Sequence, residues 1–287
     1  MPEPSDTEAA RVDSLAAGDG AWTPPTPRDA ATVCLLRDTA AGPEVFVLRR
    51  NPSMNFAARM HVYPGGAVEA SDADVPTAGR VGDAWLDART SSDRGRAVLV
   101  AAARETFEEC GVLLGVDAAG RAAAYDDGLE ADREALLRDD LAFADLLAAR
   151  GLVVDDSAIV PFAHWLTPEI EDRRFDARFF VAAQPGEQQA RHVGGEADRS
   201  AWWRPGDALA AYAEGRMAMW PPTIATMRFL AEHASAAEAL AAARAAEVVP
   251  VMPEQYRDGG GFGVRLVHAR TRAFVADVDS REYGGDG

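Results

Sequence analysis

Three glutamates lie close together in one short segment of the sequence. Carboxylates recur at positions i, i+3 and i+4 in the run Arg104-Glu105-Thr106-Phe107-Glu108-Glu109, and this spacing puts them on one face of a helix. Carboxylates crowded together repel one another unless a cation lies among them. Because hard oxygen ligands are what Mg²⁺ and Mn²⁺ prefer, the spacing indicates a divalent-metal site.

The same segment has a simpler interpretation as a solvated acidic face. Arg104 and Glu108 would then form an ordinary ion pair one helical turn apart. The surrounding sequence favours the metal site, because Gly65-Gly66 can make a tight turn upstream, Asp72 follows that turn, and Gly111 can end the helix. The combination is more specific than the glutamate spacing alone.

The helix that must position these glutamates is predicted over residues 93–110. Ser92 or Asp93 can cap its start, and Gly111 stands where a left-handed residue is favoured. Helical spacing aligns mostly small residues along one stripe, namely Leu99, Ala102, Ala103, Thr106 and Cys110. We therefore expect this helix to lie close against a sheet.

Strand-like and helix-like runs alternate along the rest of the chain. Strands are predicted at 31–36, 45–48, 61–63, 159–166, 175–182 and 200–204, with at most one more, at 264–268, after Gly259. Helices are predicted over 129–150, from Pro205, from Pro221, and over 235–247. This alternation is typical of an α/β fold.

Composition excludes several classes of protein. The formal charge is -17 and all 29 basic residues are arginine, so nucleic-acid binding is disfavoured and lysine-dependent phosphate loops or Schiff bases are excluded. No apolar run approaches the roughly 18 residues needed to span a bilayer, and the first residues lack a secretory pattern. We expect a soluble cytoplasmic protein that has no membrane partner, with Cys34 and Cys110 unpaired.

The chemistry-bearing residues resemble the Nudix box. That box runs glycine, five residues, an acid, a spacer of seven, and REUxEExGU, where U is aliphatic. The matching residues are Gly66, Asp72, Arg104, Glu105, Glu108, Glu109, Gly111 and Val112. Asp72 stands where glutamate is usual, Thr106 is not aliphatic, and residues 73–103 form a longer spacer, which costs little closure entropy in a loop.

The long spacer resembles one branch of the family, the coenzyme A diphosphatases related to the mammalian peroxisomal enzyme. The likeness extends to the segments 48–52, 61–66, 161–168 and 173–180. That branch carries an arginine and a glycine ahead of the glycine turn, where this chain has Asn55 and Arg59.

The resemblance implies a fold and a domain division. We expect a Nudix fold, an α/β/α sandwich with a mixed central sheet and a helical insertion. Residues 1–28 would be a mobile tail, 29–250 the Nudix domain and 251–287 a C-terminal extension. Within the domain, 73–95 would be an insertion in the box and 117–152 the helical insertion.

The resemblance also implies a cofactor and its ligands. Mg²⁺ or Mn²⁺ would be held by Glu105 and Glu109, by Glu108 directly or through water, and by the Gly65 carbonyl. Arg104 would orient a ligating glutamate through its planar guanidinium. Glu196, which follows a glycine pair in a loop, is the candidate base that activates water.

Substrate contacts are expected just before and at the glycine turn. Arg49, Arg50 and Arg59 could grip phosphates through forked hydrogen bonds, and Gly66 would let the backbone approach the ligand. Surface charge is the alternative role for the arginines. His61 and His164 lie in apolar surroundings, where packed structural histidines are common.

The activity implied is hydrolysis of the diphosphate in a nucleoside-diphosphate-linked small molecule. Coenzyme A or an acyl derivative would give adenosine 3',5'-bisphosphate and a 4'-phosphopantetheine product. An NADH or ADP-ribose pyrophosphatase is the alternative enzyme, and a Nudix-fold module that binds nucleotides without cutting them is the alternative of another class. An RNA cap hydrolase fits poorly with the acidic charge. The helix over 129–150 is a candidate surface for a homodimer.

Overall fold

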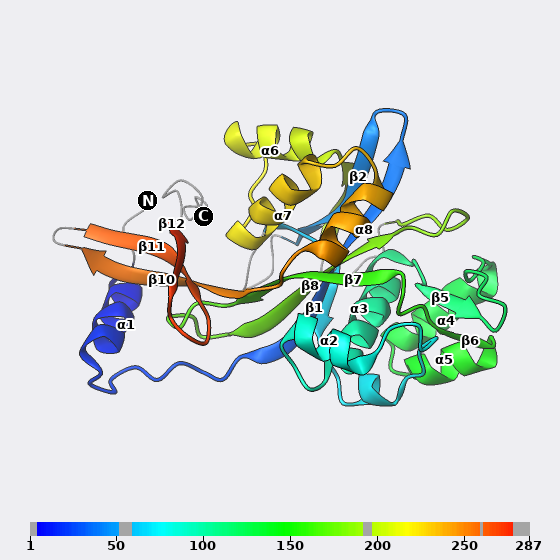
Figure 1. The fold of residues 1–287 in the computed structure, drawn as a ribbon, viewed down its shortest axis with the longest axis horizontal. Helices are drawn as coiled ribbons and strands as arrows, with labels where there is room; N and C mark the ends of the chain where they lie inside the picture. The colour runs from blue at the N-terminus through cyan, green and yellow to red at the C-terminus, as the bar shows by residue number, and fades with distance from the viewer. Residues whose placement is uncertain (1–4, 52–58, 192–196, 259–260, 278–287) are drawn as a thin grey trace.

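The computed structural model describes residues 5–51, 59–191, 197–258 and 261–277. A long hairpin runs from the middle of the molecule to its edge (Figure 1). Its strands are β1 (Arg28–Thr39) and β2 (Gly42–Arg50), as predicted from the runs at 31–36 and 45–48. The two strands pair antiparallel near the turn, where Leu36 lies opposite Val45. The start of β1 pairs instead with β4 (Gly65–Ala67), and the end of β2 pairs with β3 (His61–Val62).

Ten of the described strands form one mixed sheet, which confirms the expected α/β class. Its order is β12-β11-β10-β7-β8-β1-β2-β3, with β4 paired to β1 and β9 paired to β2. The pairs β1–β8 and β7–β10 are parallel, and the other pairs are antiparallel. The remaining strands of this sheet are β7 (Ile159–Leu166), β8 (Phe175–Ala183), β9 (Ala197–Trp203), β10 (Pro250–Asp258), β11 (Gly261–His268) and β12 (Phe274–Asp277).

Helices cover both faces of this sheet (Figure 1), as expected for a sandwich. α2 (Asp83–Thr90) and α3 (Gly95–Cys110) lie on one face. The opposite face carries α6 (Pro205–Ala213), α7 (Pro221–Ala231) and α8 (Ala236–Ala245). Successive residues of a strand point to opposite faces, so Val33 and Leu35 belong to the α3 core while Cys34 and Leu36 belong to the α7 core.

The helix α3 forms where it was predicted, and its apolar stripe is buried as expected. Its start differs from the prediction that Ser92 or Asp93 caps the helix. Arg94 is the N-cap residue, and its side chain makes no capping hydrogen bond. The Asp87 carboxylate instead accepts a hydrogen bond from the Gly95 N–H at 3.0 Å. The helix ends at Cys110 and is followed by Gly111, whose φ of 71° is left-handed, as predicted from its position.

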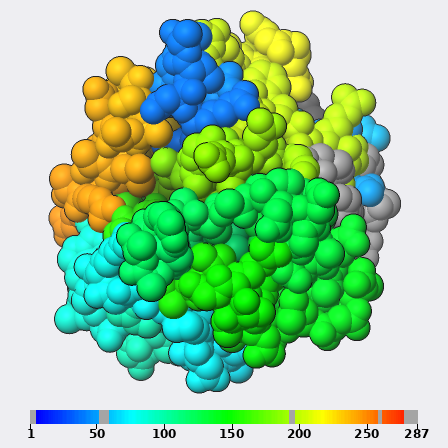
Figure 2. All heavy atoms as spheres, turned by 90° about the vertical axis from the view of Figure 1, so that its right-hand side faces the viewer, coloured from blue at the N-terminus to red at the C-terminus, as the bar shows by residue number. Residues whose placement is uncertain are grey.

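The helical insertion contains two helices rather than the single one predicted over 129–150. α4 (Asp127–Leu137) and α5 (Phe143–Ala149) are separated by a short turn, in which Asp139 has a φ of 59°. A small separate sheet joins β5 (Gly115–Asp117) to β6 (Leu152–Val154) at the two ends of the segment. Figure 2 shows the insertion, in green, over much of the lower half of one face of the molecule, beside residues drawn in cyan.

The N-terminal segment predicted as a mobile tail instead contains a helix, α1 (Asp6–Ala17). Ser5 and Glu8 form a capping box at its start, which satisfies exposed backbone donors. Long-range contacts dock the segment, since Arg11 Nη1 donates to the Ile170 carbonyl at 2.5 Å and Trp22 Nε1 donates to the Glu169 carbonyl at 2.8 Å. These partners lie far along the chain, where local patterns give no sign of them.

The C-terminal residues extend the central sheet, and the prediction of at most one strand after Gly259 was wrong. β11 and β12 both lie in that region and pair antiparallel. β10 joins them to the central sheet through Pro250 and Val251, which pair with β7. The described part of residues 251–287 is therefore continuous with the domain's own sheet. Cys34 and Cys110 are buried and free, as predicted.

Candidate active site

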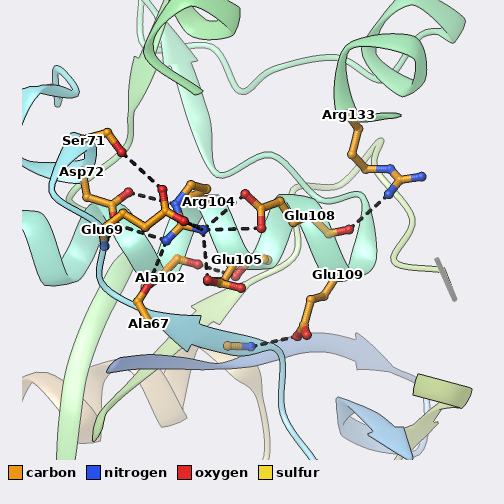
Figure 3. Close-up of polar contacts among 12 residues, drawn as sticks. Ala67, Glu69, Ser71, Asp72, Ala102, Arg104, Glu105, Glu108, Glu109 and Arg133 are labelled. Carbon is orange, nitrogen blue, oxygen red and sulfur yellow. Dashed lines mark hydrogen bonds and ion pairs between the residues drawn. The ribbon is translucent and has the colours of Figure 1, made fainter. Parts of the chain in front are cut away.

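The glycine turn and the glutamate helix are packed directly together. β4 places Gly65 opposite Thr32 and Gly66 opposite Ala31 of β1, and α3 crosses the same region (Figure 3). A Cβ atom at Gly66 would lie 2.4 Å from Glu105 Oε1, and one at Gly65 would lie 2.3 Å from the Ala31 carbonyl oxygen. At Gly65 the clash would be with backbone atoms, so only glycine fits there. A Cβ at Gly66 would displace the Glu105 carboxylate.

Arg104 is the centre of a buried ionic cluster. Its side chain is 5% exposed and forms a fork with Asp72, in which Nε donates to Oδ1 at 2.9 Å and Nη2 donates to Oδ2 at 3.2 Å. Nη2 also donates to the Ala67 carbonyl, and Nη1 donates to Glu105 at 2.9 Å and to Glu108 at 3.2 Å. Arg104 thus ties the glycine turn, the η1 turn (Ser71–Asp74) and α3 together.

The side chains of the three glutamates point in two different directions from α3. Glu105 and Glu108 converge on Arg104, whereas Glu109 turns towards β4 and accepts a hydrogen bond from the Gly65 N–H at 2.9 Å (Figure 3). Glu109 and the glycine turn are therefore in direct contact through the Gly65 backbone.

Burial makes ionisation of these carboxyl groups costly. It raises the pKa of Glu105 from its ordinary 4.5 to about 7, against the opposing attraction of Arg104. Burial also raises the pKa of Glu108, with the same opposition from Arg104. Burial alone would lower the pKa of Arg104, but hydrogen bonds to Asp72 and the nearby glutamates raise it. A cation beside the glutamates would relieve this cost.

The donor chemistry of the site fits a divalent ion. Carboxylate oxygens on one helix face, beside a backbone that leaves no room for a Cβ, are hard ligands of the kind Mg²⁺ and Mn²⁺ bind. Among the described residues, no group of three or more His, Cys, Asp or Glu side chains is gathered as a metal would gather it. Arg104 and the Gly65 N–H hold the glutamates instead.

The last turn of α3 is held by two arginines that sequence reasoning missed. Arg133 Nη1, from α4, donates to the Glu108 carbonyl at 3.1 Å (Figure 3), and the Arg191 backbone N–H donates to the Cys110 carbonyl at 3.1 Å. A signal for Arg133 was present, because it lies on the buried stripe of α4 with Leu129 and Leu136. For Arg191 the sequence offers no comparable signal.

The arginines predicted to bind substrate lie along β2 and the segment after it. Arg49 forms a forked ion pair with Asp198 of β9, with Nε donating to Oδ1 at 2.8 Å. Arg50 and Arg59 lie side by side, because the Arg59 N–H donates to the Arg50 carbonyl at 3.2 Å. Arg59 is exposed and has a left-handed φ of 62°. The Asp198 pair gives Arg49 a structural partner that the sequence did not indicate.

The remaining candidates lie elsewhere. Glu196, the predicted base, falls outside the described residues. His164 is 2% exposed and its Nε2 pairs with Asp176, as a packed structural histidine would. His61 Nδ1 lies 3.2 Å from the Ala218 carbonyl oxygen, and burial lowers the His61 pKa.

Comparison with known proteins places these features in a family context. A family model described as the NUDT19 Nudix domain matches residues 87–230. The acyl-coenzyme A diphosphatase NUDT19 of Xenopus laevis is 28% identical over 217 residues, which is 62% of this chain and 57% of the frog protein. The human protein of the same name is 26% identical over 272 residues, or 82% of this chain and 71% of the human chain.

A solved structure shares the fold at similar identity. A NUDIX hydrolase from Alicyclobacillus acidocaldarius is 29% identical, with a TM-score of 0.64, over 75% of this chain and 96% of that one. In the parts of the chain that the structure describes, no helix has both the length and the apolar character to cross a bilayer.

Proposed function

Because this chain belongs to the NUDT19 Nudix family of hydrolases, we propose that it is a metal-dependent diphosphatase acting on nucleoside-diphosphate-linked small molecules. The observation that carries the proposal is the contact between α3 and the glycine turn. Glu105 lies against Gly66, and Glu109 accepts the Gly65 N–H, so both carboxylates border one backbone surface. Such a surface suits a diphosphate and its counterions.

The residues of this site divide into ligands and supports. Glu105, Glu109, Glu108 and the Gly65 carbonyl would hold Mg²⁺ or Mn²⁺. When bound, the ion polarises the diphosphate and lowers the pKa of an attacking water. Arg104, fixed by Asp72, orients the glutamates. Glu196 remains our candidate base.

Coenzyme A or an acyl-coenzyme A is the substrate we propose. The support is the name of the frog and human relatives, acyl-coenzyme A diphosphatase; the alignment spans 57% of the frog protein. The products would be adenosine 3',5'-bisphosphate and a 4'-phosphopantetheine derivative. Arg50 and Arg59, which adjoin through their backbones, would bind phosphates, together with Arg49 if its pair with Asp198 opens.

Product analysis tests the activity and the substrate together. The protein is incubated with Mn²⁺ or Mg²⁺ and either coenzyme A, an acyl-coenzyme A, NADH or ADP-ribose, and products are separated by chromatography. We expect the two coenzyme A fragments, and a lower kcat/KM for dephospho-coenzyme A, because phosphate-binding arginines would lose their partner. Faster cleavage of NADH or ADP-ribose would replace the substrate assignment and keep the reaction class.

Replacing one proposed metal ligand tests whether the protein hydrolyses its substrate or only binds it. Glu109→Gln should lower turnover by roughly 100-fold or more, because a metal ligand is lost. Glu134→Gln is the matched control, since Glu134 lies on α4 with a side chain 58% exposed. Unchanged turnover in Glu109→Gln would refute the metal-site proposal, and absence of turnover from the unaltered protein would favour the binding-module alternative.

A further inference from the structure

Two carbonyl groups in the last turn of α3, those of Glu108 and Cys110, accept hydrogen bonds from outside the helix. A helix end leaves four carbonyls without partners in the helix. The Phe107 carbonyl accepts a hydrogen bond from the Gly111 N–H at 2.9 Å. The Glu108 carbonyl accepts one from Arg133 Nη1 at 3.1 Å, and the Cys110 carbonyl accepts one from the Arg191 N–H at 3.1 Å. The backbone of Glu108 and Cys110 is therefore held by two segments that lie outside the box.

These two segments are also joined to each other. Glu130, one turn before Arg133 on α4, forms ion pairs with both Arg133 and Arg191. The contacts make a closed ring, from the Glu108 carbonyl through Arg133, Glu130 and Arg191 to the Cys110 carbonyl. Tyr125 packs against this group of contacts, because the Arg191 guanidinium lies 4.4 Å from the centre of the Tyr125 aromatic ring.

Arg133 is chemically suited to this place. Its side chain is 4% exposed, so its charge needs a partner, and Glu130 provides one. The planar guanidinium can donate to Glu130 and to a backbone carbonyl at once. A cation at a helix C-terminus also interacts favourably with the partial negative charge there. A surface ion pair would show neither this burial nor this backbone bond.

We propose that Arg133 is a positioning residue, which fixes the last turn of α3 and thereby the carboxylates of Glu108 and Glu109. This inference rests on the proposed function. Helix ends fray when their carbonyls lose partners, and misplacing a reacting or ligating group by about 1 Å can cost about 100-fold in rate. The helical insertion would then serve the site by holding its principal helix.

The test measures metal binding and helix protection rather than turnover alone. Arg133→Met should weaken Mn²⁺ binding about tenfold, as loss of an outer support commonly does. Hydrogen exchange of the peptide covering residues 104–114 should become faster. Arg138→Met is the matched control, because Arg138 flanks the same helix with a side chain 59% exposed. It should change neither quantity.

Two further variants keep the test decisive if Arg133→Met folds poorly. Arg133→Lys retains the charge but not the fork, so Mn²⁺ binding should fall between the unaltered protein and Arg133→Met. Glu130→Gln leaves Arg133 without its charged anchor and should also weaken Mn²⁺ binding. Unchanged Mn²⁺ affinity in the folded variants overturns the inference.

A parallel measurement distinguishes this inference from the proposed function. Glu109→Gln is titrated with Mn²⁺ beside the arginine variants. If Glu109→Gln binds Mn²⁺ weakly while the Arg133 variants bind normally, only the positioning role is wrong. If Glu109→Gln binds Mn²⁺ normally, the metal site itself is wrong and the positioning role falls with it.

Discussion

The helices α3 and α7 lie on opposite faces of the same sheet but are buried in different ways. α3 buries Arg104 and Thr106 and lies against the buried Asp72, within a mainly apolar core. α7 buries Ile224, Met227 and Leu230, and its buried polar side chains are threonines. One of them, Thr226, donates back to the Pro222 carbonyl of its own helix at 2.8 Å.

The α7 face of the sheet is stabilised by apolar burial, whereas the α3 face also contains buried charges. Apolar burial stabilises in proportion to area and needs no partner. A buried charge is tolerated only with a matched partner in good geometry. The α3 face therefore depends on specific pairings, whereas the α7 face depends on volume, and substitutions on the two faces should fail in different ways.

The largest expected effect is the loss of the Arg104–Asp72 pair. Arg104→Met leaves the Asp72 carboxylate, 1% exposed, without its partner, and breaking a buried pair costs about 3 to 5 kcal/mol. Urea unfolding measures the change in the free energy of unfolding. Adding Asp72→Leu should recover part of the loss, because it removes the unpaired buried carboxylate, while Glu105 and Glu108 still lack Arg104. A loss as small as that of an exposed ion pair would show that the α3 face does not rely on this pairing.

A cavity on the opposite face should cost stability without changing metal affinity. Ile224→Ala removes a fully buried side chain from α7, and such truncations cost about 2 to 5 kcal/mol. Mn²⁺ titration at 25 °C should give the affinity of the unaltered protein, because α7 lies across the sheet from α3. A weaker Mn²⁺ affinity in this variant would mean that the two faces are coupled.

Glu105→Gln should change activity and stability in opposite directions. Turnover should fall, whereas stability without metal should rise. Turnover should fall by roughly 100-fold, because a proposed metal ligand is lost. The folded-state pKa of about 7 exceeds the ordinary 4.5, so the folded state binds the proton more tightly. Without metal, stability contributed by the protonated carboxyl is lost as pH rises from 4.5 to 7.

The measurement for this variant is thermal unfolding in EDTA at two pH values. Above pH 7 the ionised Glu105 is disfavoured in the fold, so Glu105→Gln should melt higher than the unaltered protein. Below pH 4.5 the Glu105 carboxyl is protonated in both the folded and the unfolded state, so this group should cause no difference in melting temperature between the two proteins. A lower melting temperature above pH 7 would contradict the raised pKa of Glu105.

The remaining prediction concerns the pH dependence of metal binding. Below pH 7, Glu105 must release a proton before it can bind a cation, so Mn²⁺ affinity should rise by about tenfold for each pH unit and then level off. The raised pKa of Glu108 acts in the same direction. Calorimetry in two buffers of different ionisation enthalpy detects the released proton. A pH-independent affinity between pH 5 and 7 would remove Glu105 from the ligand set.

Local periodicity accounts for the parts of the fold that were predicted correctly. α3, the β1–β2 hairpin and the helices starting at Pro205 and Pro221 depend on residues near one another in sequence. The prediction of one helix over 129–150 was wrong, because the turn with Asp139 in a left-handed conformation contains neither glycine nor proline. α1 was missed although Ser5 and Glu8 form a capping box that is visible in the sequence. Its docking could not be predicted, because Arg11 donates to the distant Ile170 carbonyl.

The sequence by itself determined that Glu105, Glu108 and Glu109 share a helix face, because a helical repeat fixes that relation locally. It also determined that a glycine turn precedes the helix and that the family is Nudix. Only the tertiary structure decided that Gly66 lies against Glu105, that Arg104 is locked by Asp72, and that Arg133 and Arg191 hold the end of α3. Those contacts join residues distant in the chain, and the folded sheet and insertion bring them together.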